Sequence, residues 1–242
     1  MAGVRKVIKS VVSHLIDSKP GKRLANLYLL RHKDFAVSFL QKHNKKAIKD
    51  INIDELNRPR GFEDLSWLFS SSKANRGIIR IDLSEAAYLF SLARSIPAAK
   101  ILEIGRYEGG STILFAAATD ENAMLTSVDI SPKSDNILMR LLTKFNLDKK
   151  VELIIDDANN LNSKSKHYDI IFIDGDHSYE GVHKDYENWK DAVKIGGHLL
   201  FHDCYRFSPG VFNIYEEIKK RDQHLFKEHK KVASLVDFLR IN

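Results

Sequence analysis

The chain has 242 residues, of which 43% are hydrophobic, and this is enough for one large domain with a substantial core plus a smaller extension. Its single cysteine, Cys204, excludes an intramolecular disulfide, and no apolar run is long enough to predict a membrane-spanning helix. The net charge of +6 is uneven, because residues 1–49 hold twelve of the 38 Lys and Arg but only two of the 32 Asp and Glu. We therefore expect a cytoplasmic protein with a basic first segment and an acidic remainder.

The first segment predicts a basic amphipathic helix. Between residues 4 and 16 apolar side chains recur at helical spacing, and basic side chains lie on the opposite face. A second helical region is expected over 24–49. A basic helix within residues 1–19 could lie on an anionic membrane surface. We favour the alternative, in which it packs on its own domain or on a second subunit, and we therefore expect a homo-oligomer.

A connector is expected over 50–80, with a turn at Arg58-Pro59-Arg60-Gly61. Within it, Trp67-Leu68-Phe69 could form an apolar plug or a lid on the substrate side. The residues from Asp82 to Glu85 predict the start of a helix that continues to Arg94. We accordingly divide the chain into a basic helical extension with its connector, 1–80, and an α/β domain, 81–242.

From residue 100 onward, short apolar strands alternate with helices. The strands are expected at 100–104, 125–129, 151–155, 168–174 and 198–202. The helices are expected at 111–118, 137–145, 182–193 and 211–220. This alternation predicts a mostly parallel sheet with both faces covered. Two final strands, at 224–232 and 234–241, could add an antiparallel edge, which makes the expected fold a Rossmann-like, doubly wound α/β sheet of seven strands.

A glycine-rich loop follows the first of these strands. The apolar run Ile101–Ile104 leads into Gly105-Arg106-Tyr107-Glu108-Gly109-Gly110, after which the helix begins. In nucleotide-type sheets, ligands bind beyond the carboxyl end of such a strand. Tyr107 occupies the position of the second glycine in a dinucleotide fingerprint, and no Lys follows the glycines as in a Walker A loop. The loop therefore suits a ligand that lacks phosphates, although a plain strand-to-helix turn is the alternative.

Two acids lie near this loop. Asp129 ends the second strand, 24 positions after Gly105, where an acid can accept hydrogen bonds from both hydroxyls of a ribose. The alternative for Asp129 is an ordinary helix cap. Glu103 lies in a strand that should be buried, and an unpaired buried charge is costly. Its partner could be an ammonium group of the ligand, or a network of backbone groups or water.

The strongest local signal is the segment F-I-D-G-D-H-S-Y-E-G, which begins at Phe172. It places Asp174 at the end of one strand, and the next strand ends in His202-Asp203. Adjacent parallel strands would bring these side chains together, with Asp176 and His177 just beyond. Clustered carboxylates repel one another unless a cation or a proton intervenes. Carboxylates with one imidazole suit Mg²⁺, Mn²⁺ or a similar ion, whereas caps and turns are the alternative.

The segment 99–240 resembles the class I O-methyltransferases that use S-adenosylmethionine (SAM). It is most similar to the metal-dependent group related to macrocin and other sugar O-methyltransferases, and more distantly to catechol O-methyltransferase. The resemblance rests on the combination of E-x-G-x-x-x-G-x-S from Glu103 with D-G-D-H-x-Y-E-G from Asp174, followed by His202-Asp203.

This resemblance implies roles for individual residues. The implied SAM-binding residues are Glu103, Gly105, Tyr107, Gly109, Ser111, Asp129, Asp157, Ala158 and Asp174. Asp157 and Ala158 take the position that contacts the adenine amino group in the family. The implied metal ligands are Asp174, Asp203 and His202, although relatives usually have Asp, Glu or Asn in place of His202. Relatives use a base at the position of either Asp176 or His177, and an imidazole suits neutral pH without much tuning.

We therefore expect SAM-dependent methyl transfer to a hydroxyl of a small molecule, assisted by Mg²⁺ or Mn²⁺. The expected acceptor is a vicinal diol of a sugar or a glycosylated metabolite. One alternative is a methyltransferase that acts on nucleic acid through the basic first segment, and another is a SAM-binding module without catalysis. No nucleic-acid partner is expected, because the first segment lacks interleaved aromatic residues and the remainder is acidic.

Overall fold

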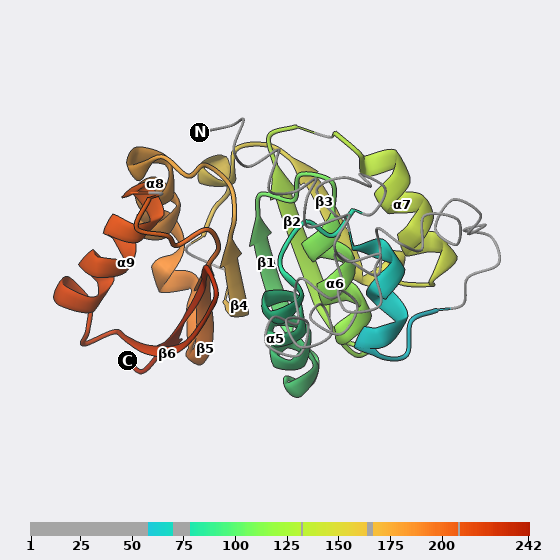
Figure 1. Ribbon diagram of the computed structural model, residues 1–242, viewed down its shortest axis with the longest axis horizontal. Helices are drawn as coiled ribbons and strands as arrows, with labels where there is room; N and C mark the ends of the chain where they lie inside the picture. The colour runs from blue at the N-terminus through green and yellow to red at the C-terminus, as the bar shows by residue number, and fades with distance from the viewer. Residues whose placement is uncertain (1–57, 70–77, 132, 164–166, 208) are drawn as a thin grey trace, which may run out of the picture.

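A computed structural model describes residues 58–69, 78–131, 133–163, 167–207 and 209–242. Within them, seven strands form one sheet in the order β3-β2-β1-β4-β5-β7-β6 (Figure 1). The first five strands in this order are parallel, and β7 is antiparallel to both β5 and β6. The expected fold, a mostly parallel sheet with an antiparallel edge, is confirmed. The helices expected over 4–16 and 24–49 lie outside the described residues, and the roles expected for them stay predictions.

The elements follow the predicted alternation. The strands are β1 (Lys100–Ile104), β2 (Met124–Asp129), β3 (Val151–Ile155), β4 (Tyr168–Ile173), β5 (Val193–Phe201), β6 (Phe226–Val232) and β7 (Leu235–Arg240). The α-helices are α5 (Leu83–Ser95), α6 (Gly110–Ala118), α7 (Asp135–Lys144), α8 (Tyr179–Trp189) and α9 (Pro209–Arg221). The 3-10 helices are η2 (Phe62–Leu68), η3 (Asp148–Lys150), η4 (Ala158–Asn160) and η5 (Lys190–Ala192).

The predicted boundary between the helix at 182–193 and the strand that follows it is wrong. The helix expected over 182–193 ends at Trp189, and the strand expected to begin at His198 begins at Val193. The physical reason is η5, a 3-10 turn that ends the helix and leads the chain into the sheet, where Val193 pairs with Tyr168 of β4. Among the described residues, no helix is both long and apolar enough to cross a membrane.

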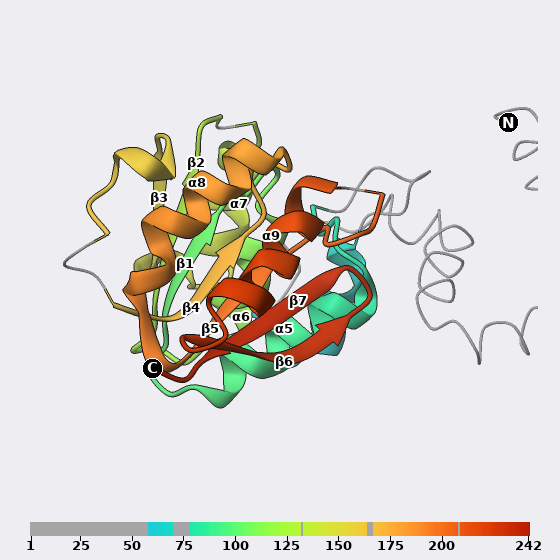
Figure 2. The ribbon, with the colours of Figure 1, turned by 90° about the vertical axis from the view of Figure 1, so that its left-hand side faces the viewer.

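Helices cover both faces of the sheet, as Figures 1 and 2 show. On one face, Ile101 of β1 packs into the core formed with α5, α6 and α7. On the other face, the neighbouring residue Leu102 packs into the core formed with α8 and α9. Burial on both faces explains why the parallel strands are apolar almost throughout.

The described residues before position 81 contribute to the core on the α5–α7 side. Leu65, Leu68 and Ile79 are buried there, and the backbone N–H of Ile79 donates to the oxygen of Leu68 at 3.0 Å. Phe69 is also buried in this core, so with Leu68 it forms an apolar plug rather than a lid. The side chain of Trp67 lies outside the described part of the structure, and the division of the chain at residue 80 stays a prediction.

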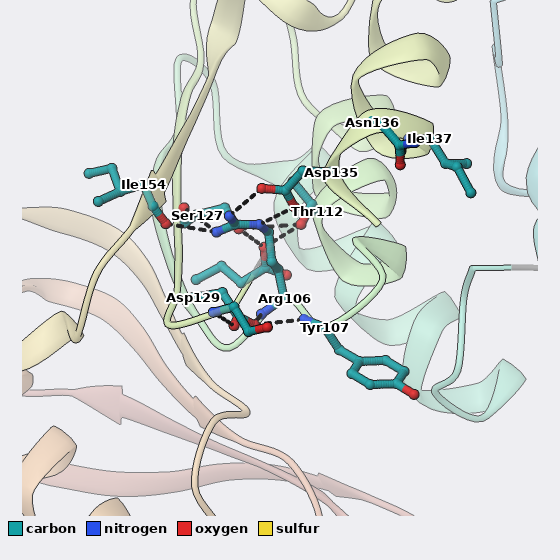
Figure 3. Close-up of polar contacts among 11 residues, drawn as sticks. Arg106, Tyr107, Thr112, Ser127, Asp129, Asp135, Asn136, Ile137 and Ile154 are labelled. Carbon is teal, nitrogen blue, oxygen red and sulfur yellow. Dashed lines mark hydrogen bonds and ion pairs between the residues drawn. The ribbon is translucent and has the colours of Figure 1, made fainter. Parts of the chain in front are cut away.

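One buried arginine ties the glycine loop to its neighbours (Figure 3). Arg106 is 2% exposed, and its guanidinium donates to the two carboxylate oxygens of Asp135 in α7 at 2.9 and 2.6 Å. It also donates to the backbone oxygens of Ser127 in β2, at 3.1 Å, and of Ile154 in β3, at 2.9 Å. Only the planar fork of an arginine offers enough donors for this set. Arg106 therefore fixes the loop against two strands and a helix.

Removing this guanidinium should destabilise the fold. We expect Arg106→Ala to lower the free energy of unfolding by about 2–4 kcal/mol, somewhat less than for a fully buried ion pair because Asp135 is partly exposed. Arg106→Lys should recover little of the loss, since an ammonium cannot make the bidentate contact. Urea denaturation measures both. Arg140→Ala, on the exposed side of α7, is the matched control and should stay within about 0.5 kcal/mol of wild type. Equal stability of Arg106→Ala and Arg140→Ala would contradict this account.

Candidate functional site

A cavity of about 780 Å³ opens at the carboxyl ends of the parallel strands. Its walls come from the loops after β1 to β5 and from α8, which is where an open α/β sheet binds its ligands. Seven aspartates line it against three Arg or Lys side chains. The excess of acids gives the cavity a negative potential, and this favours a ligand or ion of positive charge.

The structure brings most of the predicted cofactor residues to this cavity. Those that line it are Gly105, Tyr107, Asp129, Asp157, Ala158 and Asp174. Glu103, Gly109 and Ser111 are not among its lining residues. Gly109 caps α6 with a φ of 85°, and Ser111 lies in the first turn of that helix.

Gly105 allows the loop after β1 to pass close to the end of β4. Its φ is +86°, and a Cβ added there would lie 2.3 Å from the backbone oxygen of Asp174. Only glycine meets both demands. Tyr107 follows with a φ of 50° and a ring that is 49% exposed at the cavity. The Lys133 Nζ lies 4.6 Å from the centre of this ring, a cation–π contact.

Asp129 accepts hydrogen bonds from the glycine loop (Figure 3), and its role toward a ribose stays a prediction. One carboxylate oxygen accepts hydrogen bonds from the backbone N–H groups of Arg106 and Tyr107, both at 2.9 Å, and the other accepts from Ser131 at 2.7 Å. The acid therefore shapes the glycine loop. A carboxylate has about four acceptor positions, so these bonds leave capacity for about one ligand hydroxyl rather than two.

Glu103 is fully buried and takes part in a hydroxyl network. Its Oε2 accepts from Thr112 Oγ1 at 2.5 Å and from the hydroxyl of Ser127, and the hydroxyl of Ser111 also contacts this carboxylate. Burial raises the pKa of Glu103 to about 6, against the hydroxyls that lower it. Its Oε1 has no hydrogen-bond partner among the described residues. Of the two partners considered, the structure contains the network, and the contact with a ligand ammonium stays a prediction.

Two carboxylates and one imidazole converge at the other end of the cavity. Asp174 follows β4, Asp203 follows β5, and the ring of His177 lies between them. Its Nε2 is 3.5 Å from Asp174 Oδ1 and its Nδ1 is 3.6 Å from Asp203 Oδ2. One ligand atom from each of the three lies within 4.8 Å of the others. The hydrogen bond to Asp174 raises the pKa of His177 above its ordinary value, although burial opposes the shift.

His202 has contacts that differ from those of a metal ligand. Its Nδ1 lies 3.1 Å from Asp174 Oδ1, and its Nε2 lies 3.1 Å from Oε2 of Glu85 at the start of α5. Burial alone would lower the pKa of His202, but the two carboxylates raise it to about 11. A ring nitrogen that faces a carboxylate donates its N–H, whereas a metal needs the lone pair. The geometry therefore favours a positively charged His202 that pairs with two acids.

Asp176, the second candidate base, is engaged locally. Its two carboxylate oxygens accept from the backbone N–H and the hydroxyl of Ser178, at 2.8 and 2.9 Å. The backbone hydrogen bond holds the pKa of Asp176 below its ordinary value. A carboxylate stabilised in this way is a weak base, so the geometry favours His177.

Two site residues were missed by the sequence analysis. Glu85 was considered only as part of a helix cap, yet it is buried, and its Oε1 accepts from the backbone N–H and hydroxyl of Ser234 at 2.7 and 2.6 Å. Asp185 on α8 is also buried and lines the cavity. A signal for Asp185 was present, because this acid falls in the buried helical stripe with Val182 and Trp189.

Comparisons with known proteins show similarity to methyltransferases. A family model described as a methyltransferase domain matches residues 102–204. A Dictyostelium discoideum protein named "Probable caffeoyl-CoA O-methyltransferase 3" is 25% identical over 213 residues, which cover 85% of this chain and 78% of that protein. Tapetum-specific methyltransferase 1 of Arabidopsis thaliana is 26% identical over 189 residues, which cover 71% of this chain and 80% of that protein.

A solved structure adds evidence on the fold. The O-methyltransferase from Bacillus cereus in complex with SAH matches with a TM-score of 0.55 and 21% identity, covering 69% of this chain and 86% of that chain. At this identity the likeness shows the fold alone.

The buried acid on α8 should make stability depend on pH. Burial raises the pKa of Asp185 from 3.8 to about 6, so the folded state holds this proton more tightly than the unfolded chain does. Its contribution to stability therefore falls as the pH rises from 4 through 6. Asp185→Asn should remove the penalty and raise the free energy of unfolding by about 1–3 kcal/mol at pH 7.5, with no gain at pH 4. Denaturation at both pH values measures this, and a variant that is less stable at pH 7.5 would contradict it.

Proposed function

We propose that the chain is a class I SAM-dependent O-methyltransferase and that it methylates a vicinal diol of a small molecule with the help of a divalent cation. The observation that carries this proposal is the convergence of Asp174, His177 and Asp203 at one end of the acidic cavity. This arrangement places candidate cation ligands and a candidate base beside the space for a positively charged cofactor.

The acidic lining of the cavity suits the positive charge of SAM. When bound, SAM supplies an electrophilic methyl group on a positively charged sulfur. Asp129 has remaining capacity to accept from a ribose hydroxyl, as described above. Ile130, directly after it, is 78% exposed and lines the cavity, so it can pack on the face of the adenine ring. Tyr107 of the glycine loop lines the cavity and is 49% exposed, so its ring can contact the ligand.

The donor set fits a divalent cation. Carboxylates are the preferred ligands of Mg²⁺, which keeps several of its waters and needs only one or two protein ligands. We assign Asp174 and Asp203 to this role and leave out His202, because its two nitrogens lie at hydrogen-bond distance, 3.1 Å, from Asp174 and Glu85. The nitrogens of His177 lie farther from their carboxylates, at 3.5 and 3.6 Å. When bound, the cation would lower the pKa of an acceptor hydroxyl and fix its position.

His177 is the proposed base. Neutral imidazole at this position can take the proton of the acceptor hydroxyl, and the neighbouring Asp174 and Asp203 stabilise the imidazolium that results. Proton removal and in-line positioning are what methyl transfer to oxygen requires of the protein. Asp176 is the weaker candidate for the reason given above.

Two acceptor classes carry a vicinal diol. The sugar assignment rests on the D-G-D-H-x-Y-E-G segment. A catechol-type acceptor is the second candidate, supported by a pair of stacked rings close to Asp203. Tyr205 and Phe207 stack at 4.7 Å between centres and 12° between planes, and Phe207 is 84% exposed. An exposed ring of this kind could pack on a planar acceptor.

A direct assay separates the acceptor classes. With methyl-labelled SAM, we expect transfer to a methyl rhamnoside to exceed transfer to 3,4-dihydroxycinnamate, and Phe207→Ala to leave transfer to the rhamnoside within about threefold of wild type. Faster methylation of the cinnamate, with its KM raised by Phe207→Ala, would reassign the acceptor to the catechol class.

Activity should require a divalent cation. We expect methyl transfer to stop when the protein is stripped with a chelator and to recover with Mg²⁺ or Mn²⁺. Asp203→Asn should abolish transfer while the Kd of SAH changes less than about threefold, because the expected cofactor contacts lie on other loops. Calorimetry and a labelled-methyl assay measure the two effects. Full activity of verified metal-free protein would contradict the cation.

His177→Ala is the matched variant for this experiment. It should lower kcat by about 10²–10⁴ and leave the cation requirement unchanged if His177 is the base. A large loss of cation affinity instead would show that His177 is a ligand. A larger loss of rate in Asp176→Asn than in His177→Ala would move the base to Asp176.

A further inference from the structure

A buried carboxylate lies in the cavity wall beside Gly175. Asp185 of α8 is 6% exposed, and its Oδ1 accepts a hydrogen bond from Asn159 Nδ2 at 2.7 Å. Its Oδ2 receives no hydrogen bond from any described residue, and Asp185 lines the cavity wall. A Cβ added to Gly175 would lie 3.7 Å from this oxygen, so the missing side chain keeps space open beside it. A carboxylate buried without a donor is costly unless a ligand supplies one.

Asn159 holds this acid in place. Its amide Nδ2 donates to Asp185 and also to Oδ1 of Asp157, at 2.9 Å. Both partners only accept, so the orientation of the amide is fixed, and its Oδ1 is buried without a partner among the described residues. The wall at η4 and α8 therefore holds two acceptor oxygens that no described donor satisfies. Asn159 Oδ1 is buried, whereas Asp185 Oδ2 adjoins the space beside Gly175.

Asp157, which the sequence resemblance assigns to the adenine amino group, is already engaged. Its Oδ1 accepts from the backbone N–H of Asn159 at 2.8 Å as well as from the amide, and its Oδ2 lies 3.3 Å from Lys184 Nζ. The hydrogen bond from the backbone of Asn159 holds the pKa of Asp157 below its ordinary value. Of the two neighbouring acids, only Asp185 has a carboxylate oxygen that accepts no hydrogen bond from a described residue.

The wall at η4 and α8 is the part of the cavity that remains for the adenine of the cofactor. In the proposed function, the ribose lies at Asp129 and the sulfur near Asp174. The remaining walls combine apolar surface at Ile130 and Ala158 with the unpaired acceptor of Asp185. Apolar faces with acceptors at one edge are what an aminopurine needs, because its ring stacks and its exocyclic amino group donates.

We propose that Asp185, oriented by Asn159, accepts a hydrogen bond from the 6-amino group of the cofactor's adenine and thereby selects adenine over a 6-oxopurine. This inference rests on the proposed binding of SAM. A 6-oxo group would place an oxygen against unpaired acceptors, and a buried site built for a donor rejects a ligand that lacks it.

Calorimetry with two product analogues tests this assignment. The probes are SAH and S-inosyl-L-homocysteine, which carries an oxygen in place of the 6-amino group, and the pH is 7.5. We expect wild type to bind SAH at least about 10-fold more tightly than the inosyl analogue. Asp185→Asn should weaken SAH binding about 10- to 100-fold and narrow or reverse this preference, because an amide can donate to the 6-oxo group. Glu180→Gln, on the exposed first turn of α8, is the control and should change neither affinity.

A second variant tests the need for open space beside Gly175 rather than the need for the Asp185 carboxylate. Gly175→Ala would add a methyl group at ordinary contact distance, 3.7 Å, from both Asp185 and Ile104, so the fold can accept it. It should weaken SAH binding about 10-fold without lowering the melting temperature. If wild type binds SAH but Asp185→Asn keeps its affinity and preference, Asp185 is not the adenine contact and the proposed function stands. If folded wild type does not bind SAH, the proposed function and this inference both fail.

Discussion

The site depends on the close passage of two backbones at the edge of the sheet. Gly105, at the end of β1, lies so near Asp174, at the end of β4, that any side chain at position 105 would meet the Asp174 carbonyl. The Gly105 N–H bonds to Val128 at 2.8 Å, and the Asp174 N–H bonds to Ile104 at 2.8 Å. The close approach of these two strand ends brings the glycine loop and the converging acids into one cavity. The Arg106 guanidinium then fixes the loop against β2, β3 and α7.

The acids of the cavity are stabilised in different ways, and the differences suggest their roles. Backbone N–H groups donate hydrogen bonds to Asp129, Asp157 and Asp176. Asp174 faces two imidazoles, whose hydrogen bonds hold its pKa below the ordinary value although burial opposes the shift. Asp185 has a single amide donor and an open oxygen. We infer that Asp129, Asp157 and Asp176 stabilise the loops of the site as well as facing the ligand. We also infer that Asp174 acts in methyl transfer and that Asp185 accepts a hydrogen bond from the bound ligand.

Much of this could be predicted from the sequence, because it depends on local patterns. Apolar runs such as Ile101–Ile104 identify the strands, the glycines identify the cofactor loop, and strand ends place Asp174 beside Asp203. What could not be predicted depends on distant pairs. Glu85 and His202 are 117 positions apart in the sequence. No local pattern indicates that the carboxylate of Glu85 contacts Nε2 of His202, which was expected to bind the metal. The end of α8 was also not predicted. The sequence pattern of a helix continues through Lys190–Ala192, but these residues form a 3-10 helix instead of a further turn of α8.

The most direct measurement is a crystal structure of the protein with SAH and Mn²⁺, using anomalous diffraction to locate the ion. We expect SAH in the acidic cavity, with its ribose at Asp129, and an anomalous peak bound by Asp174 and Asp203. SAH bound outside this cavity, or a peak at another site with none between these two carboxylates, would contradict this prediction.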